Sequence, residues 1–239
     1  MEPIAKASPS RAARVIGAVW LAYFLTAILG GYLVKGLVVP ADAAATARNI
    51  VAHETLYRSG FAVGLIANAI YIALTALLYR LFEPVDRSIS LIAAFLSLVG
   101  CATQIFGGLF QLAPLVVVGR GQFMGAFNEE QLQAATLLSL KLYSQTFNIS
   151  LVLFALFGLA IGYLIIRSTF LPRVLGVLMV IAGSAWLSFL WPPLATPLLP
   201  YLVALNIGEL VLPLWLLVKG VDVSKWHAIA SAGEVGRGY

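Results

Sequence analysis

The chain has 239 residues, of which 61% are hydrophobic and 10% charged, and its formal net charge at pH 7 is +5. Soluble domains carry about 25% charged residues, so this composition excludes an ordinary soluble protein and indicates that most of the chain lies in lipid. A single cysteine, Cys101, excludes an internal disulfide and multi-cysteine metal sites. Both histidines, His53 and His227, lie outside the predicted apolar core, so we expect neither a metal nor a cofactor. We attribute the excess positive charge to loops that fix membrane orientation, not to nucleic-acid binding.

Long apolar runs predict transmembrane helices, because about 20 such residues cross a ~30 Å hydrocarbon core. Six are predicted, at residues 14–38, 58–82, 88–113, 134–167, 172–191 and 197–219. We expect Pro114 to close the third span and Trp191-Pro192-Pro193 the fifth. The predicted fold class is therefore all-α, a polytopic membrane bundle of six transmembrane helices. The transmembrane domain comprises residues 14–219, between an N-terminal tail at 1–13 and a C-terminal tail at 220–239.

The distribution of Lys and Arg predicts that both termini and both tails are cytoplasmic. With the N-terminus inside, ten of the 15 basic residues lie on the cytoplasmic side. This agrees with the excess of Lys and Arg that cytoplasmic loops carry. The other five basic residues lie on the outer side, and they are Lys35, Arg48, Arg58, Arg120 and Lys141.

Two outer loops are predicted to contain short helices. Asp42 is suited to cap an alanine-rich helix that ends before Gly60. Asn128 is suited to cap a second helix, whose first turn carries Glu129 and Glu130 and which continues into the fourth span. These helices form either a solvent-facing lid or a gate over an outward-facing cavity.

Polar and small residues recur three and four positions apart on the predicted spans, so they share helix faces. Polar groups in lipid need partners and small residues allow close helix approach, so these faces are expected to point inward. A rise of ~1.5 Å per residue brings one set of polar side chains to similar depth, roughly the middle of the membrane. This polar layer is the candidate ligand-binding site, and its members are Glu209, Asn206, Gln104, Asn68, Tyr71, Tyr23, Thr26 and Ser184.

A second set of polar side chains is predicted at the outer mouth of the bundle. On the same rise Lys141 lies roughly 39 Å from the cytoplasmic end and Glu209 roughly 14 Å, so we expect no salt bridge between them. The members of the outer mouth are Gln111, Lys141, Ser144, Gln145, Asn148, Lys35 and Arg58.

Glu209 lies near the middle of an apolar run, where a lone carboxylate costs at least ~2.5–3.5 kcal/mol. It is either protonated, donating a hydrogen bond to Asn68, Gln104 or a tyrosine, or ionised and balanced by a cationic ligand, a proton pathway or water. The first alternative is structural and the second functional. The glycine pairs Gly60/Gly64 and Gly158/Gly162 are interpreted as contacts within the bundle, not as a dimer interface.

No metalloprotease, serine hydrolase, P-loop, dinucleotide or CxxC motif occurs, and we assign no catalytic residue. Three functions stay open: a ligand- or lipid-binding or sensory bundle, which we favour, a proton-coupled small-molecule transporter, and an accessory or assembly subunit of a larger membrane complex. A membrane enzyme is a fourth and less favoured alternative. Transport is less favoured because we expect all six spans to be unbroken. The expected partners are the lipid bilayer, a small amphipathic or lipid ligand, and a membrane-protein partner or second copy, but no nucleic acid.

Four segments together resemble a known family over nearly the whole chain. They read VPADAAATARNI, FNEEQLQAATLLSLKLY, RSTFLPRVLGVLMVIAG and GELVLPLWLLVKGV. They resemble the bacterial family called domain of unknown function 4386. The resemblance implies a six-span protein of the bacterial cytoplasmic (inner) membrane, and no activity that transfers to particular residues.

Overall fold

The computed structural model describes residues 8–39, 42–118 and 127–235. Arg120, which we counted on the outer side, lies outside these residues, as do the ends of both predicted tails.

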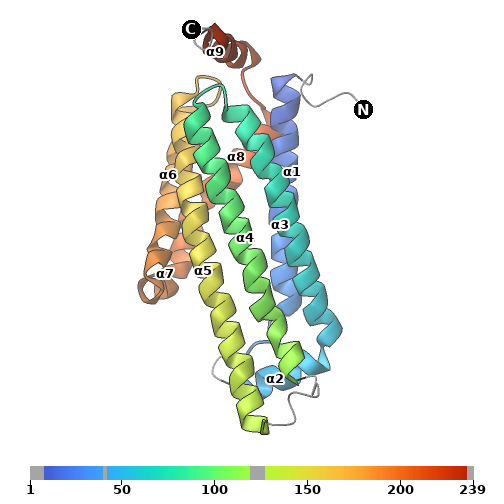
Figure 1. Ribbon diagram of the computed structural model, residues 1–239. Coiled ribbons are helices and arrows are strands. Elements are labelled where there is room, and N and C mark those ends of the chain that lie inside the picture. The colour runs from blue at the N-terminus through green and yellow to red at the C-terminus, as the bar shows by residue number, and fades with distance from the viewer. Residues whose placement is uncertain (1–7, 40–41, 119–126, 236–239) are drawn as a thin grey trace. The chain divides into compact units, whose positions relative to one another are not determined.

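The described chain is helical, without strands, and six of its helical segments are long and apolar enough to cross a membrane (Figure 1). This confirms the predicted all-α bundle and makes the chain a multi-pass membrane protein. Four spans are single helices: α1 (Pro9–Val34), α3 (Glu54–Phe82), α4 (Arg87–Val118) and α5 (Glu129–Arg167). The fifth span consists of α6 (Arg173–Trp186) and the 3-10 turn η3 (Leu187–Leu190), and the sixth of α7 (Pro192–Leu205) and α8 (Ile207–Val218). Two shorter helices are α2 (Ala43–Ala52) and α9 (Val223–Val235).

The prediction that Pro114 closes the third span was wrong, because α4 continues through it to Val118. Proline removes one backbone donor, but membrane helices tolerate it where neighbouring groups satisfy the freed carbonyl. The predicted end of the fifth span was correct, since η3 ends at Leu190 and α7 starts with Pro192.

The sixth span is interrupted, and the expectation that it would be unbroken was wrong. Asn206 separates α7 from α8 with φ −82° and ψ 7°, a ψ outside the helical range of about −20° to −70°. Pro197 and Pro200 lie inside α7 and remove two backbone donors from the turns before the break. The span is therefore two half-helices and not one rod.

Backbone contacts divide the chain into two compact units. The first unit contains residues 1–22, 70–101 and 149–239, and the second contains residues 23–69 and 102–148.

In the second unit, α2 is fixed by its cap and by a small apolar core. The carboxylate of Asp42 accepts the N–H of Ala45 at 2.7 Å, which confirms the predicted cap. Ile50 of α2 packs in one cluster with Leu37 and Tyr57, and the Tyr57 hydroxyl donates to the carbonyl of Gln111 at 2.5 Å.

The start of α5 also follows the prediction. The Asn128 side chain accepts the N–H of Gln131, and the Gln131 side chain accepts the N–H of Asn128, both at 2.9 Å. This reciprocal pair satisfies two free donors at the helix start. From there α5 runs without a break to Arg167, as expected.

In the first unit, glycines set how closely the helices approach. A Cβ added to Gly17 of α1 would lie 2.5 Å from the carbonyl oxygen of Pro213 in α8. A Cβ on Gly162 of α5 would lie 2.9 Å from the carbonyl oxygen of Gly176 in α6. Gly158 faces Gly183 in the same α5–α6 contact, so the interpretation of Gly158 and Gly162 as contacts within the chain is confirmed.

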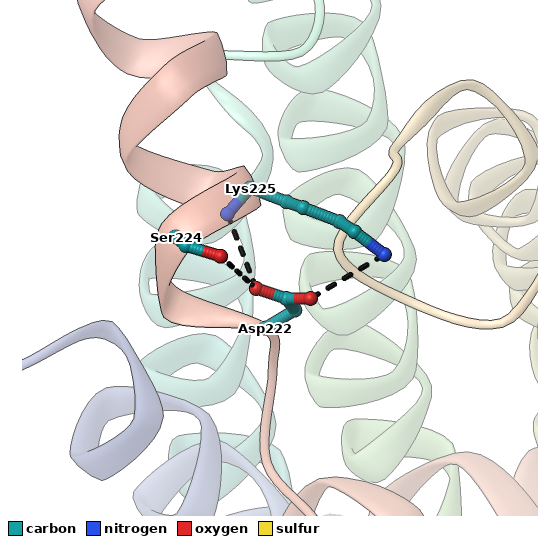
Figure 2. Close-up of polar contacts among 3 residues, drawn as sticks. All are labelled: Asp222, Ser224 and Lys225. Carbon is teal, nitrogen blue, oxygen red and sulfur yellow. Dashed lines mark hydrogen bonds and ion pairs between the residues drawn. The ribbon is translucent and has the colours of Figure 1, made fainter.

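The last helix, α9, begins with a side-chain cap within the segment predicted as a tail (Figure 2). Asp222 accepts the hydroxyl of Ser224 at 2.7 Å and the N–H of Lys225 at 3.2 Å, and it lies 3.4 Å from the Lys225 ammonium. The Ser224 hydroxyl, followed by the Lys225 N–H, lowers the pKa of Asp222 from its ordinary value. The Trp226 indole then donates to the carbonyl of Leu81 at 3.1 Å and holds α9 against the end of α3.

We predict that Gly17→Ala destabilises the protein, because the new methyl would meet backbone atoms of α8 that cannot rotate away. Overpacking of this kind costs about 1–3 kcal/mol, which is a fall of several degrees in melting temperature for a chain of this size. The measurement is thermal unfolding in mild detergent. Gly31→Ala is the control, because Gly31 lies in the same helix with nothing within 4 Å of its added Cβ, and it should unfold no earlier than wild type. Equal melting temperatures for the two variants would contradict the α1–α8 contact.

Candidate functional site

The candidate site is built around Asn206, the residue between the two half-helices of the sixth span. Asn206 is only 8% exposed. Its Nδ2 donates to the carbonyl of Leu202 at 2.7 Å, and its backbone N–H bonds to the carbonyls of Leu202 and Val203, both at 3.1 Å. All these donors go to the last turn of α7, so Asn206 caps the end of α7.

The other side-chain atom of Asn206 has no partner. Its Oδ1 is the one buried side-chain nitrogen or oxygen among the described residues that makes no hydrogen bond. The sequence Asn206-Ile207-Gly208-Glu209 has the spacing of a capping box, in which Oδ1 would accept an N–H of the first turn of α8. That bond is absent, and α8 begins without a side-chain cap. The acceptor is therefore left unused at the start of a helix.

Glu209 lies in the first turn of α8 and is partly buried. The side chain of Trp186, at the end of α6, lies close to its carboxyl group. Trp186 packs against a cluster that includes Phe189 of η3 and Leu202 of α7. The carbonyl of Leu202 accepts the hydrogen bond from the Asn206 side-chain amide. Trp186 therefore lies close to Glu209 and also packs in the cluster that contains the partner of Asn206.

Gly208 fixes the start of α8 against α6. A Cβ added to Gly208 would lie 2.7 Å from the carbonyl oxygen of Leu178, which leaves room for glycine only. Trp186 follows Leu178 by eight residues, roughly 12 Å further along α6. Side chains on a helix tilt toward its N-terminus, so the carboxyl of Glu209 reaches from the level of Leu178 back toward Trp186 and Asn206.

The electrostatics of this region favour a hydrogen-bond donor or a positive charge. A buried acceptor without a partner costs about 1–3 kcal/mol, and a carboxylate deep in a membrane costs at least ~2.5–3.5 kcal/mol. The position of Glu209 in the first turn of α8 returns only about 0.3–1 kcal/mol through the helix dipole. The ion pairs in the described part of the first unit are elsewhere, between Arg87 and Glu83 and between Lys225 and Asp222.

Two further members of the predicted polar layer belong to the first unit. Tyr71 is buried, with its ring packed edge-on against Phe154 and Phe157, at centroid distances of 4.9 and 6.0 Å. Ser184 is exposed on α6.

The remaining members of the polar layer belong to the second unit. Asn68 is partly buried and donates to the carbonyl of Gly64 in its own helix at 3.0 Å. Tyr23, Thr26 and Gln104 are also partly buried. Their convergence on Glu209 stays a prediction.

The predicted outer-mouth residues all lie in the second unit. Arg58 pairs with Glu54 of its own helix at 2.7 Å, and the carbonyl of Gln111 accepts the Tyr57 hydroxyl. Asn148 is partly buried, and the exposed members are Lys35, Lys141, Ser144 and Gln145. Their role at a mouth stays a prediction.

Sequence reasoning missed Trp186 and Gly208. Tryptophan usually finds an acceptor for its N–H when it is buried, and Glu209 is the acid that lies deep in the predicted spans, so the proximity of the partly buried Trp186 to Glu209 was open to prediction. The contact of Gly208 with Leu178 had no comparable signal, because many glycines occur in these spans. Among the described residues, no group of three or more His, Cys, Asp or Glu side chains is placed to hold a metal ion.

Comparisons with known proteins identify a family. Neither the curated proteins nor the solved structures gave a match. A family model described as Domain of unknown function (DUF4386) matches residues 15–220, a range that contains Asn206 and Glu209. The match runs from the first turns of α1 to beyond the end of α8 and so includes the interrupted span. This chain therefore belongs to the DUF4386 family of domains of unknown function.

Proposed function

We propose that this protein binds a small ligand within the membrane, at the interruption of its sixth span. The observation that carries this proposal is the unpartnered, buried Oδ1 of Asn206 at the start of α8. Buried polar groups in proteins nearly always have a partner, and one that does not requires an explanation. A ligand that donates to this oxygen supplies one.

The structural alternative is that Asn206 and Glu209 only hold helices together. The Nδ2 of Asn206 and the contact between Glu209 and Trp186 do serve that purpose. They leave Oδ1 unused, however. A residue with a purely structural role at this position would be expected to use its side-chain acceptor to cap α8. Binding accounts for the unused acceptor as well as for the used donors.

A second candidate function is proton-coupled transport of the same ligand, and the interrupted span favours it. Transporters commonly bind substrates and coupling ions where a membrane helix is broken near its middle. Glu209 lies in the first turn after the break and is the group that would carry the proton. Transport would add a movement of the half-helices to the binding that we propose.

We further place the protein in the cytoplasmic membrane of a bacterium, with both termini in the cytoplasm. The excess of basic residues on one side of the six spans supports this orientation. A fluorescent protein that matures only in the cytoplasm, fused after Tyr239, is expected to be bright. If this fusion is dark and an alkaline phosphatase fused at the same place is active, the orientation is the opposite of the one we propose.

The binding proposal predicts an adduct that depends on Glu209. In native mass spectrometry of protein released from mild detergent, we expect a bound mass on wild type that is absent from Glu209→Gln, because the amide cannot supply a negative charge. Glu54→Gln is the control, since Glu54 is also a helical glutamate but is exposed and paired with Arg58; it should keep the adduct. If wild type and Glu209→Gln are equally bare and equally stable, the proposal is contradicted and the accessory-subunit function is favoured.

A further inference from the structure

The hydrogen-bonding groups at the break determine what kind of ligand fits there. Asn206 offers an unused acceptor, Oδ1, while its backbone N–H and one N–H of Nδ2 bind carbonyls of α7. Glu209 offers a carboxyl group with two oxygens, and the nearby side chain of Trp186 has a single N–H donor. The side-chain oxygens at the break therefore outnumber the side-chain donors close to them, and a partner that donates hydrogen bonds would use these oxygens.

The charge at the break points the same way. Glu209 lies in a candidate membrane span, and the nearby side chain of Trp186 is neutral. The contacts around it are apolar: Leu178 faces the start of α8, and Phe189 and Leu202 pack with Trp186. These side chains carry no charge that could balance the Glu209 carboxylate. A partner with a positive charge would balance it.

Among positive partners, the number of oxygens favours an ammonium group over a metal ion. Hard metal ions take six or more oxygen ligands, either from the protein or from water. The break supplies one amide oxygen and one carboxyl group, and the described residues contain no metal-binding group of acids, histidines and cysteines. A primary ammonium needs only as many acceptors as its three N–H donors.

Resting on the proposed function, we propose that the ligand group at the break is a primary ammonium that donates to Oδ1 of Asn206 and to the carboxylate of Glu209. The group belongs either to a free small amine or to the head group of an aminolipid. Both sources present the same chemistry to these two residues. The alkyl remainder of the ligand contacts the apolar side chains around Trp186.

The experiment compares cations of equal charge that differ in their N–H donors. Thermal unfolding of the detergent-solubilised full chain is followed in methylammonium, tetramethylammonium or sodium chloride at equal concentration. We expect methylammonium to raise the melting temperature of wild type in a saturable way, and tetramethylammonium and sodium not to. In Glu209→Gln we expect the apparent Kd for methylammonium to rise at least about tenfold. Glu54→Gln is the control, because Glu54 is a helical glutamate that is exposed and paired with Arg58, and it should respond as wild type does.

Glu209→Gln keeps the size of the side chain and one of its oxygens, so it is expected to fold. Asn206→Leu provides an independent test of Oδ1, and it should weaken the methylammonium response without changing the response to sodium. An equal response to tetramethylammonium or sodium, or an unchanged response in Glu209→Gln, would overturn the ammonium assignment. No response of wild type to methylammonium would overturn it too.

The mass of the adduct and the readdition of lipids distinguish an aminolipid from a free small amine. After delipidation, readdition of phosphatidylethanolamine restores the adduct and the higher melting temperature if the ligand is a lipid, and phosphatidylcholine does not. A free amine leaves both lipids without effect while methylammonium stabilises. A Glu209-dependent adduct of a neutral or acidic molecule would keep the proposed function and overturn the ammonium assignment, whereas the absence of any adduct and of any cation response would overturn both.

Discussion

Everything at the candidate site depends on one constraint, which is that backbone polar groups in a membrane must be satisfied by the protein itself. A break in a spanning helix exposes such groups, and it is tolerated only where other protein covers it. Here Gly208 lies directly against the backbone of Leu178, so the start of α8 is in contact with α6. The donors of Asn206 satisfy the last turn of α7. The break is therefore a built feature of the fold.

This constraint also explains the unusual position of Glu209. In an unbroken helix its side chain would stand on a smooth apolar rod, and its charged form would be balanced by nothing but distant groups. The interruption places it in the first turn of a new helix, where the dipole is favourable. It also lets the carboxyl meet Trp186 beside the cluster that contains Leu202. Asn206 and Glu209 together then place two side-chain acceptor groups at the start of a half-helix, which is the property that both proposals use.

Much of the fold was predictable, because the length of an apolar run and the chemistry of caps are local properties. The spans, the caps at Asp42 and Asn128, and the join between the outer helix and α5 follow from short windows of sequence. The break in the sixth span was not predicted, although Pro197, Pro200 and the capping-box spacing at Asn206 were visible. A hydropathy profile does not detect a helix break at Asn206, because its immediate neighbours, Leu205 and Ile207, are apolar. Depth counting along a straight rod then placed Asn206 and Glu209 at a similar depth, but it did not identify Trp186, whose pairing with Glu209 depends on how α6 and α8 pack.

The central claim is that the sixth span is two half-helices joined at Asn206. Solid-state NMR of the protein in lipid bilayers tests it most directly, through the Cα and Cβ secondary chemical shifts from Leu202 to Leu214. The account predicts helical shifts up to Ala204 and again from Gly208, with a loss of helical shift at Asn206 and a side-chain amide proton of Asn206 that exchanges slowly because it binds Leu202. Continuous helical shifts through Asn206, with rapid exchange of its side-chain amide, would contradict it.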